Sequence, residues 1–153
     1  MADVEKDLIK AETLLAQYEY DKARKKFNDV IKAEPKHPMG YFGKAEASLG
    51  MPKIKVDDII ELYQKAVELD PENVYFLTTL GSFCSDVGKF NEAEQFYTKA
   101  TEIDEENASM YFSEFAISYY LKNTCWHFLH QFYTKATEID EENASMYFSG
   151  NRK

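Results

Sequence analysis

One segment of this chain occurs twice without a single difference. The sequence QFYTKATEIDEENASMYFS runs over residues 95–113 and returns over residues 131–149. A repeat at a fixed spacing is the sequence signature of stacked supersecondary units, so it constrains the fold before any single residue does. The copy is more faithful than packing alone requires, and it fits either a recent duplication in the DNA or deliberate design.

The composition favours helices and limits the kinds of partner. Apolar residues make up 44% of the 153 residues and charged residues 29%, with only six glycines and four prolines, which is typical of a soluble helical protein. The formal net charge of -9 repels nucleic-acid backbones and anionic membrane surfaces. Without an apolar run of membrane-spanning length or a signal-like start, we expect a cytoplasmic protein with no nucleic-acid or membrane partner.

Apolar residues recur at intervals of three and four along most of the chain, which predicts a series of short amphipathic helices. Pro35 and Pro38 end the second helix, Gly50 ends the third, and Gly88 lies at a later turn. Asn73 is placed to cap the helix that follows it. Paired in order, the helices predict four hairpins over about residues 3–35, 38–70, 74–104 and 108–140, and a short final helix over about 144–149.

The third hairpin has the clearest pattern of small and large residues. Glycine and alanine stand where two helix backbones approach, and an aromatic residue stands where a gap must be filled. Counted from Val74, these positions are Gly81, Ala93, Tyr97 and Ala100. In this spacing the unit resembles a tetratricopeptide repeat, whose hairpin of about 34 residues has small residues at its eighth, twentieth and twenty-seventh positions and an aromatic near its twenty-fourth.

The resemblance covers nearly the whole chain. The fourth hairpin departs most, with Phe115 and Leu129 where the family has small residues, and its duplicated helix returns with two extra residues in the turn. The resemblance implies an all-α fold, a right-handed α-solenoid of about four helix-turn-helix hairpins, with residues 1–153 as one domain. Matching positions in the first two hairpins are Ala11, Ala23, Phe27, Pro35, Ala45, Tyr63, Ala66 and Pro71.

In this family the first helices of successive hairpins line a concave face. Aromatic area with few charges on such a face suits an extended or helical peptide, although several of these aromatics could instead pack between hairpins. The family's clamp of Lys, Asn and Arg for an acidic chaperone tail is absent, so the expected partner segment is basic or apolar rather than acidic. The concave positions predicted here are Leu8, Glu12, Met39, Phe42, Glu46, Tyr75, Thr79, Ser82, Phe112, Ala116 and Tyr119.

Nothing in the sequence supports catalysis, because it has neither a glycine-rich phosphate loop nor a nucleophile motif. We therefore expect a protein that is not an enzyme and has no cofactor. Only Cys125, His127 and His130 resemble metal ligands, and a zinc site needs three or four ligands with supporting partners. The favoured interpretation of these residues is an irregular turn without a metal. Cys84 and Cys125 are too few for a disulfide framework.

These patterns lead to three hypotheses. The first is a protein-interaction scaffold that binds a peptide segment in the aromatic concave groove. The second is self-association as a dimer, since residues 131–139 repeat residues 95–103 and either copy can fill the same slot on the preceding helix. An open apolar surface at Met146, Tyr147 and Phe148 would add to that contact. The third is a metal-binding protein at Cys125, His127 and His130.

Overall fold

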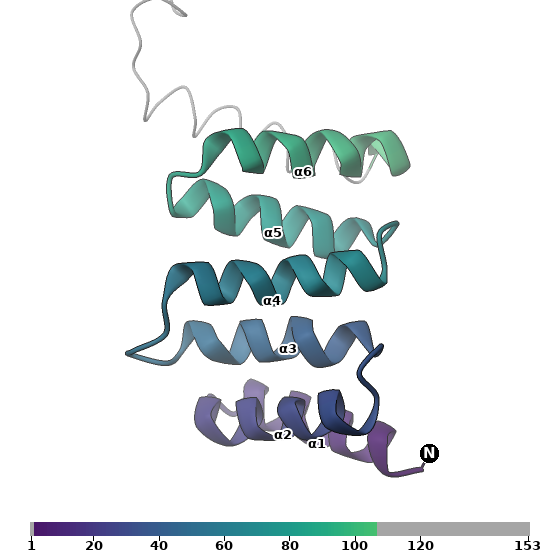
Figure 1. Cartoon of the computed structure of the whole chain (residues 1–153), viewed down its shortest axis with the longest axis vertical. Helices are drawn as coiled ribbons and strands as arrows, with labels where there is room; N and C mark the ends of the chain where they lie inside the picture. Colours follow the sequence, from purple (N-terminus) through teal and green to yellow (C-terminus); the bar gives the residue numbers. More distant parts are fainter. Residues whose placement is uncertain (1, 107–153) are drawn as a thin grey trace, which may run out of the picture. The chain divides into compact units, whose positions relative to one another are not determined.

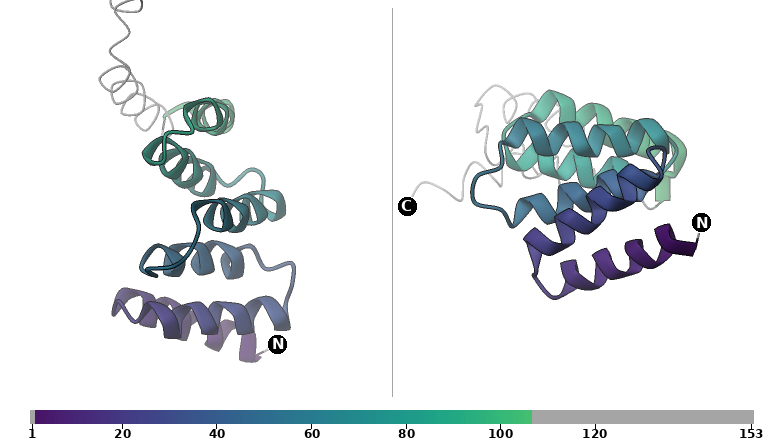
Figure 2. Two further views of the ribbon diagram at one scale, coloured as in Figure 1. Left: turned by 60° about the vertical axis from the view of Figure 1, so that its left-hand side comes forward. Right: turned by 60° about the horizontal axis from the view of Figure 1, so that its bottom comes forward.

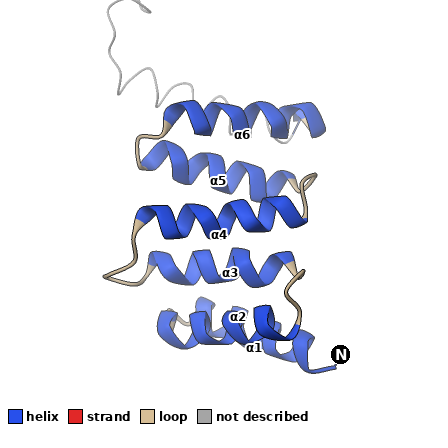
Figure 3. Ribbon diagram, in the orientation of Figure 1, coloured by secondary structure: helices blue, strands red, loops and turns tan. Residues whose placement is uncertain are grey.

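The computed structural model describes residues 2–106, which form six α-helices and no strand (Figure 3). This confirms the predicted all-α helical-repeat fold class. The described residues all belong to one compact unit, Met1–Ser113. The predicted fourth hairpin, the final helix and the repeat at 131–149 lie outside the described residues. The helices are α1 (Ala2–Ala16), α2 (Tyr20–Ala33), α3 (Pro38–Leu49), α4 (Val56–Leu69), α5 (Val74–Asp86) and α6 (Phe90–Ile103) (Figure 1).

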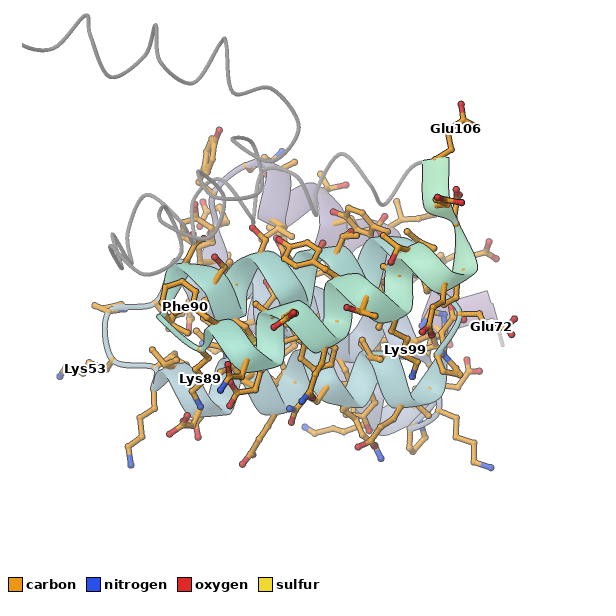
Figure 4. The ribbon with its side chains drawn as sticks, turned by 90° about the horizontal axis from the view of Figure 1, so that it is seen from above. Lys53, Glu72, Lys89, Phe90, Lys99 and Glu106 are labelled. Atoms are coloured by element: carbon orange, nitrogen blue, oxygen red, sulfur yellow. The ribbon has the colours of Figure 1, made fainter. Side chains whose placement is uncertain are left out.

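Consecutive helices of this unit lie side by side and antiparallel, so each hairpin stacks on the one before it (Figures 1 and 2). The turns within the second and third hairpins lie at one end of the helices, and the connections between hairpins lie at the other (Figure 1). Figure 4 shows Lys53, Lys89 and Phe90 toward the first end, and Glu72 and Glu106 toward the second. Helices adjacent in sequence therefore bury one another's apolar faces.

Local chemistry explains where α5 begins and ends. The side-chain oxygen of Asn73 accepts a hydrogen bond from the backbone N–H of Phe76 at 3.2 Å, which satisfies one unpaired amide of the first turn. After the helix, Gly88 takes a φ of 82°, in the left-handed region that a Cβ disfavours. The backbone N–H of Lys89 then donates to the carbonyl of Cys84 at 2.8 Å and closes the turn.

Small residues allow the helices to approach, and large side chains fill the spaces between them. A Cβ added at Gly43 of α3 would lie 2.1 Å from the ring of Phe27, so this contact requires glycine. The ring of Tyr97 on α6 lies against Gly81 of α5 in the same way, 3.1 Å from where a Cβ would stand. Phe27 itself is completely buried, in a cluster with Ala11, Ala23 and Ala47.

In the part of the chain that the structure describes, no helix has both the length and the apolar character to cross a bilayer. Residues 2–106 also hold no group of three His, Cys, Asp or Glu placed to bind a metal ion. Cys125, His127 and His130 lie outside this range. Burial raises the pKa of the Cys84 thiol to about 11, which keeps it protonated and unreactive.

Candidate peptide-binding groove

A cluster of aromatic rings joins α3, α4 and α5. The ring of Phe42 stacks on Phe76, with ring centroids 4.6 Å apart and planes inclined by 21°. Tyr63 of α4 meets the same ring edge-on at 5.4 Å, and Tyr75 approaches it at 5.3 Å. Such offset and edge-on pairs stabilise beyond the area they bury. The cluster holds the second and third hairpins together beneath one surface.

The hydroxyl of Tyr63 connects this core to the surface. It donates a hydrogen bond to Oε1 of Glu46 on α3, while the Tyr63 side chain is only 1% exposed. Burial raises the pKa of Tyr63 far above its ordinary value of 10.0, and the hydrogen bond and charge of Glu46 raise it further. The tyrosine therefore stays a neutral donor and holds the half-buried Glu46 carboxylate in one orientation.

Above this bond lies a concave site, which we call the α3–α5 groove. Its volume is about 260 Å³. Two aromatic residues of α5 line it, Tyr75, which is 61% exposed, and Phe83, which is half-buried. Two carboxylates, Glu46 and Asp86, are among the described residues that line it, and none of these lining residues is basic. The complete lining is Glu46, Leu49, Tyr63, Tyr75, Thr78, Thr79, Ser82, Phe83 and Asp86.

The structure brings together four of the eleven predicted groove positions, because Glu46, Tyr75, Thr79 and Ser82 all line the α3–α5 groove. Phe42 differs from the expectation. It is only 3% exposed, because Phe76 and Tyr63 cover its ring, so it supports the groove from below.

The remaining predicted positions do not line this groove. Leu8 packs against the cluster around Phe27. Glu12 is exposed on α1, and Met39 is half-buried in the first turn of α3. Phe112, Ala116 and Tyr119 lie outside the described residues, as do Met146, Tyr147 and Phe148.

Sequence reasoning missed five lining residues: Leu49, Tyr63, Thr78, Phe83 and Asp86. A signal for Asp86 was present, because positions 75, 79, 82 and 86 follow one row of α5 at intervals of four, three and four. Phe83 lies four residues beyond Thr79 and so shares that face. Tyr63 could not be found in this way, because it belongs to the buried core pattern of α4.

Residues 62–95 match a family model that is described as a tetratricopeptide repeat. The match begins one residue before Tyr63 and includes the whole of α5. The chain therefore contains a tetratricopeptide repeat. Its groove is thus built by the second helix of one repeat hairpin and by the first helices of two.

The similar proteins include one found by sequence and others found by structure. Anaphase-promoting complex subunit 3 of Schizosaccharomyces pombe is 27% identical over 96 residues, which is 61% of this chain and 14% of that protein. MamA from Desulfovibrio magneticus RS-1 superposes with a TM-score of 0.60 at 27% identity, over 65% of this chain and 55% of that chain. The TPR2B domain of yeast Sti1, in a complex with pHsp70, gives 0.66 at 21% identity, over 78% and 95%.

This chain spans about a seventh of the subunit from Schizosaccharomyces pombe and little more than half of the MamA chain. The likeness to the Sti1 domain covers most of both chains and shows a shared fold.

Proposed function

We propose that this protein is a non-catalytic interaction scaffold that binds a peptide segment of another protein in the α3–α5 groove. The observation that carries the proposal is an exposed aromatic side chain, Tyr75, beside a concave site above a packed aromatic floor. Exposed tyrosines in such places supply a large contact area at a low cost in side-chain entropy. The Sti1 domain, which shares the fold, is in a complex with pHsp70.

The floor of the groove favours binding because it is already in place. Phe42 and Phe76 are stacked and buried, and Tyr63 fixes Glu46 by a hydrogen bond. A site that does not need to order its side chains loses less entropy on association. The groove can therefore bind a short segment without a large contact area.

The charge of the groove selects the chemistry of the segment. Glu46 and Asp86 supply two carboxylates, and the lining residues supply no cation. An acidic segment would meet like charges, whereas a Lys or Arg side chain would meet carboxylates between the aromatic residues Tyr75 and Phe83. We therefore propose a basic or apolar segment as the ligand.

The test uses a peptide library with basic, apolar and acidic members, screened against the full chain. For the tightest peptide, calorimetry compares the wild type with Tyr75→Ala. We expect the affinity to fall by at least about tenfold, because a central aromatic anchor is removed. Tyr18→Ala is the matched control, since Tyr18 is 76% exposed and does not line the groove. Equal affinity of all three proteins for a confirmed ligand would exclude this groove.

A second proposal concerns self-association through the repeated helix. On α6, Tyr97 is 3% exposed, and Ala93 and Ala100 are completely buried. The repeat supplies the same tyrosine and alanine at Tyr133 and Ala136, but Leu129 stands where Ala93 stands in α6. Leucine in that slot would overpack it, at a cost of about 1–3 kcal/mol.

Because of this cost, exchange of the repeated helix between two chains should depend on residue Leu129. We expect Leu129→Ala to raise the fraction of dimer, measured by light scattering behind a sizing column over a range of concentrations. Ala93→Leu should act in the same direction, because it removes the advantage of the resident copy. A strictly monomeric protein in the wild type and both variants would exclude the exchange.

A further inference from the structure

The basic residues of α2 fall into two groups. The chain as a whole carries a net charge of -9, but α2 has five basic residues and two acidic ones. Lys22, Lys25 and Lys26 form ion pairs with carboxylates at 2.6–3.4 Å. Arg24 and Lys32 form no ion pair within residues 2–106. The second group therefore consists of cations whose charge no described carboxylate neutralises.

Arg24 and Lys32 share one row of α2 with Asn28, at intervals of four residues, and Arg24 and Asn28 contact α3. The Nε–H of Arg24 donates to Oγ of Ser48 at 3.0 Å, and Nζ of Lys44 donates to Oδ1 of Asn28 at 2.9 Å. Lys44, like the two cations of α2, has no ion pair with a described carboxylate. We call these five residues the α2–α3 seam.

The two cross-helix bonds also fix the register of the seam. Position 24 lies opposite position 48 and position 28 opposite position 44, and the charge of Lys32 acts on Lys44. Arg24 uses one of its five N–H groups on Ser48, and Lys44 uses one of three on Asn28, so each has further donors for a ligand.

The cations of the seam repel one another. Burial lowers the pKa of Lys44, and the charges of Arg24 and Lys32 lower it further. Like charges in a partly buried position disfavour the charged forms until an anion neutralises them. In the part of the chain that the structure describes, each acidic residue of α2 is paired with a lysine outside the seam. An anion bound from outside the described residues would relieve this repulsion.

We propose that the α2–α3 seam binds a phosphoryl group, either free phosphate or the phosphorylated side chain of a partner protein. A phosphoryl dianion carries up to about two negative charges and three acceptor oxygens, which suits a site with three cations. The fork of the Arg24 guanidinium can bind two phosphoryl oxygens at once, and Lys44 and Lys32 add charge on either side. The site is separate from the α3–α5 groove and does not depend on its function.

The first test titrates the full chain with blocked O-phosphoserine and follows the side-chain signals by NMR. We expect the Nε–H signal of Arg24 to shift and the pKa of Lys44 to rise as the ligand binds. Lys44→Gln should weaken binding by about tenfold, which corresponds to one charge-assisted hydrogen bond. Lys25→Gln is the matched control, because it removes the same charge from an exposed ion pair of α2. Its affinity should change by less than about twofold.

The second test identifies the source of the phosphoryl group. Inorganic phosphate and blocked serine without phosphate are titrated in the same way. Equal binding of phosphate and phosphoserine would show that the free ion suffices, and tighter binding of phosphoserine would point to a modified side chain. The proposal is overturned if neither phosphoryl ligand shifts the Arg24 signal, or if Lys44→Gln and Lys25→Gln weaken binding equally. Because Tyr75 is not in the seam, neither result depends on the groove.

Discussion

At the residue scale, the hydrogen bond from Tyr63 to Glu46 links stability to function. The tyrosine ring packs in the aromatic core, and its hydroxyl sets the position of a groove carboxylate. Its pKa is raised chiefly by burial, so the unfolded chain releases this proton at a lower pH than the folded chain does. The contribution of the tyrosine is therefore complete below its ordinary pKa of 10.0 and declines as the pH rises above it.

This link predicts the behaviour of Tyr63→Phe. At pH 7 the variant should lose about 1 kcal/mol of unfolding free energy, because Glu46 loses its donor. Above pH 10.0, ionisation of Tyr63 in the unfolded chain destabilises the wild type by up to about 1.4 kcal/mol per pH unit. The variant lacks this hydroxyl, so the difference in unfolding free energy between the two proteins should shrink. Urea unfolding at several pH values measures it, with exposed Tyr18→Phe as control. A difference that does not change with pH would contradict this explanation.

Replacing either of two glycines by alanine should destabilise the protein, for a different reason at each position. Gly43→Ala should destabilise by about 1–3 kcal/mol, because the new Cβ overlaps the Phe27 ring. Gly88→Ala should cost about 1–2 kcal/mol from its φ of 82° alone, since no neighbouring atom lies within 4 Å of the Cβ position.

A second substitution separates these two causes. Phe27→Leu should recover part of the loss in Gly43→Ala and none in Gly88→Ala, as measured by urea unfolding of the single and double variants. Strict additivity in both pairs would rule out a steric origin at Gly43.

At the scale of the elements, the sequence predicted the helices better than it predicted the groove. Proline, glycine and the capping Asn73 are local signals, so they could be recognised one helix at a time. Which residues line the groove depends on which aromatic rings pack over one another. Phe42 has a concave position by spacing, yet Tyr63 and Phe76 from other helices bury it, and the hydrogen bond to Glu46 spans 17 positions of sequence. Such long-range pairs leave no periodic signal.

The cap of α5 offers a test of one element. Asn73→Ala should destabilise the protein by about 1 kcal/mol, because the backbone N–H of Phe76 loses its acceptor. Asn73→Ser keeps a capping oxygen and should lose much less. Urea unfolding and amide exchange of the first turn of α5 measure both effects. Equal losses in the two variants would show that the bond to Phe76 is not the cause.

At the scale of the whole molecule, the charges divide the surface of the described unit into unlike sites. The α3–α5 groove carries two carboxylates without a basic lining residue, and the α2–α3 seam carries three cations without an ion pair to a described carboxylate. Since α3 contributes to both sites, the tetratricopeptide-repeat fold can present opposite charges from neighbouring positions of one helix. The two sites would then select different ligands.

The central claim is that the α3–α5 groove binds a basic or apolar segment, and mapping the bound peptide by NMR tests it most directly. The full chain is titrated with the tightest library peptide, and the backbone amide shifts of residues 2–106 are followed. We predict that the largest changes occur along α5 from Tyr75 to Asp86 and around Glu46 of α3. Changes confined to other helices, or a clear preference for acidic peptides, would contradict the claim.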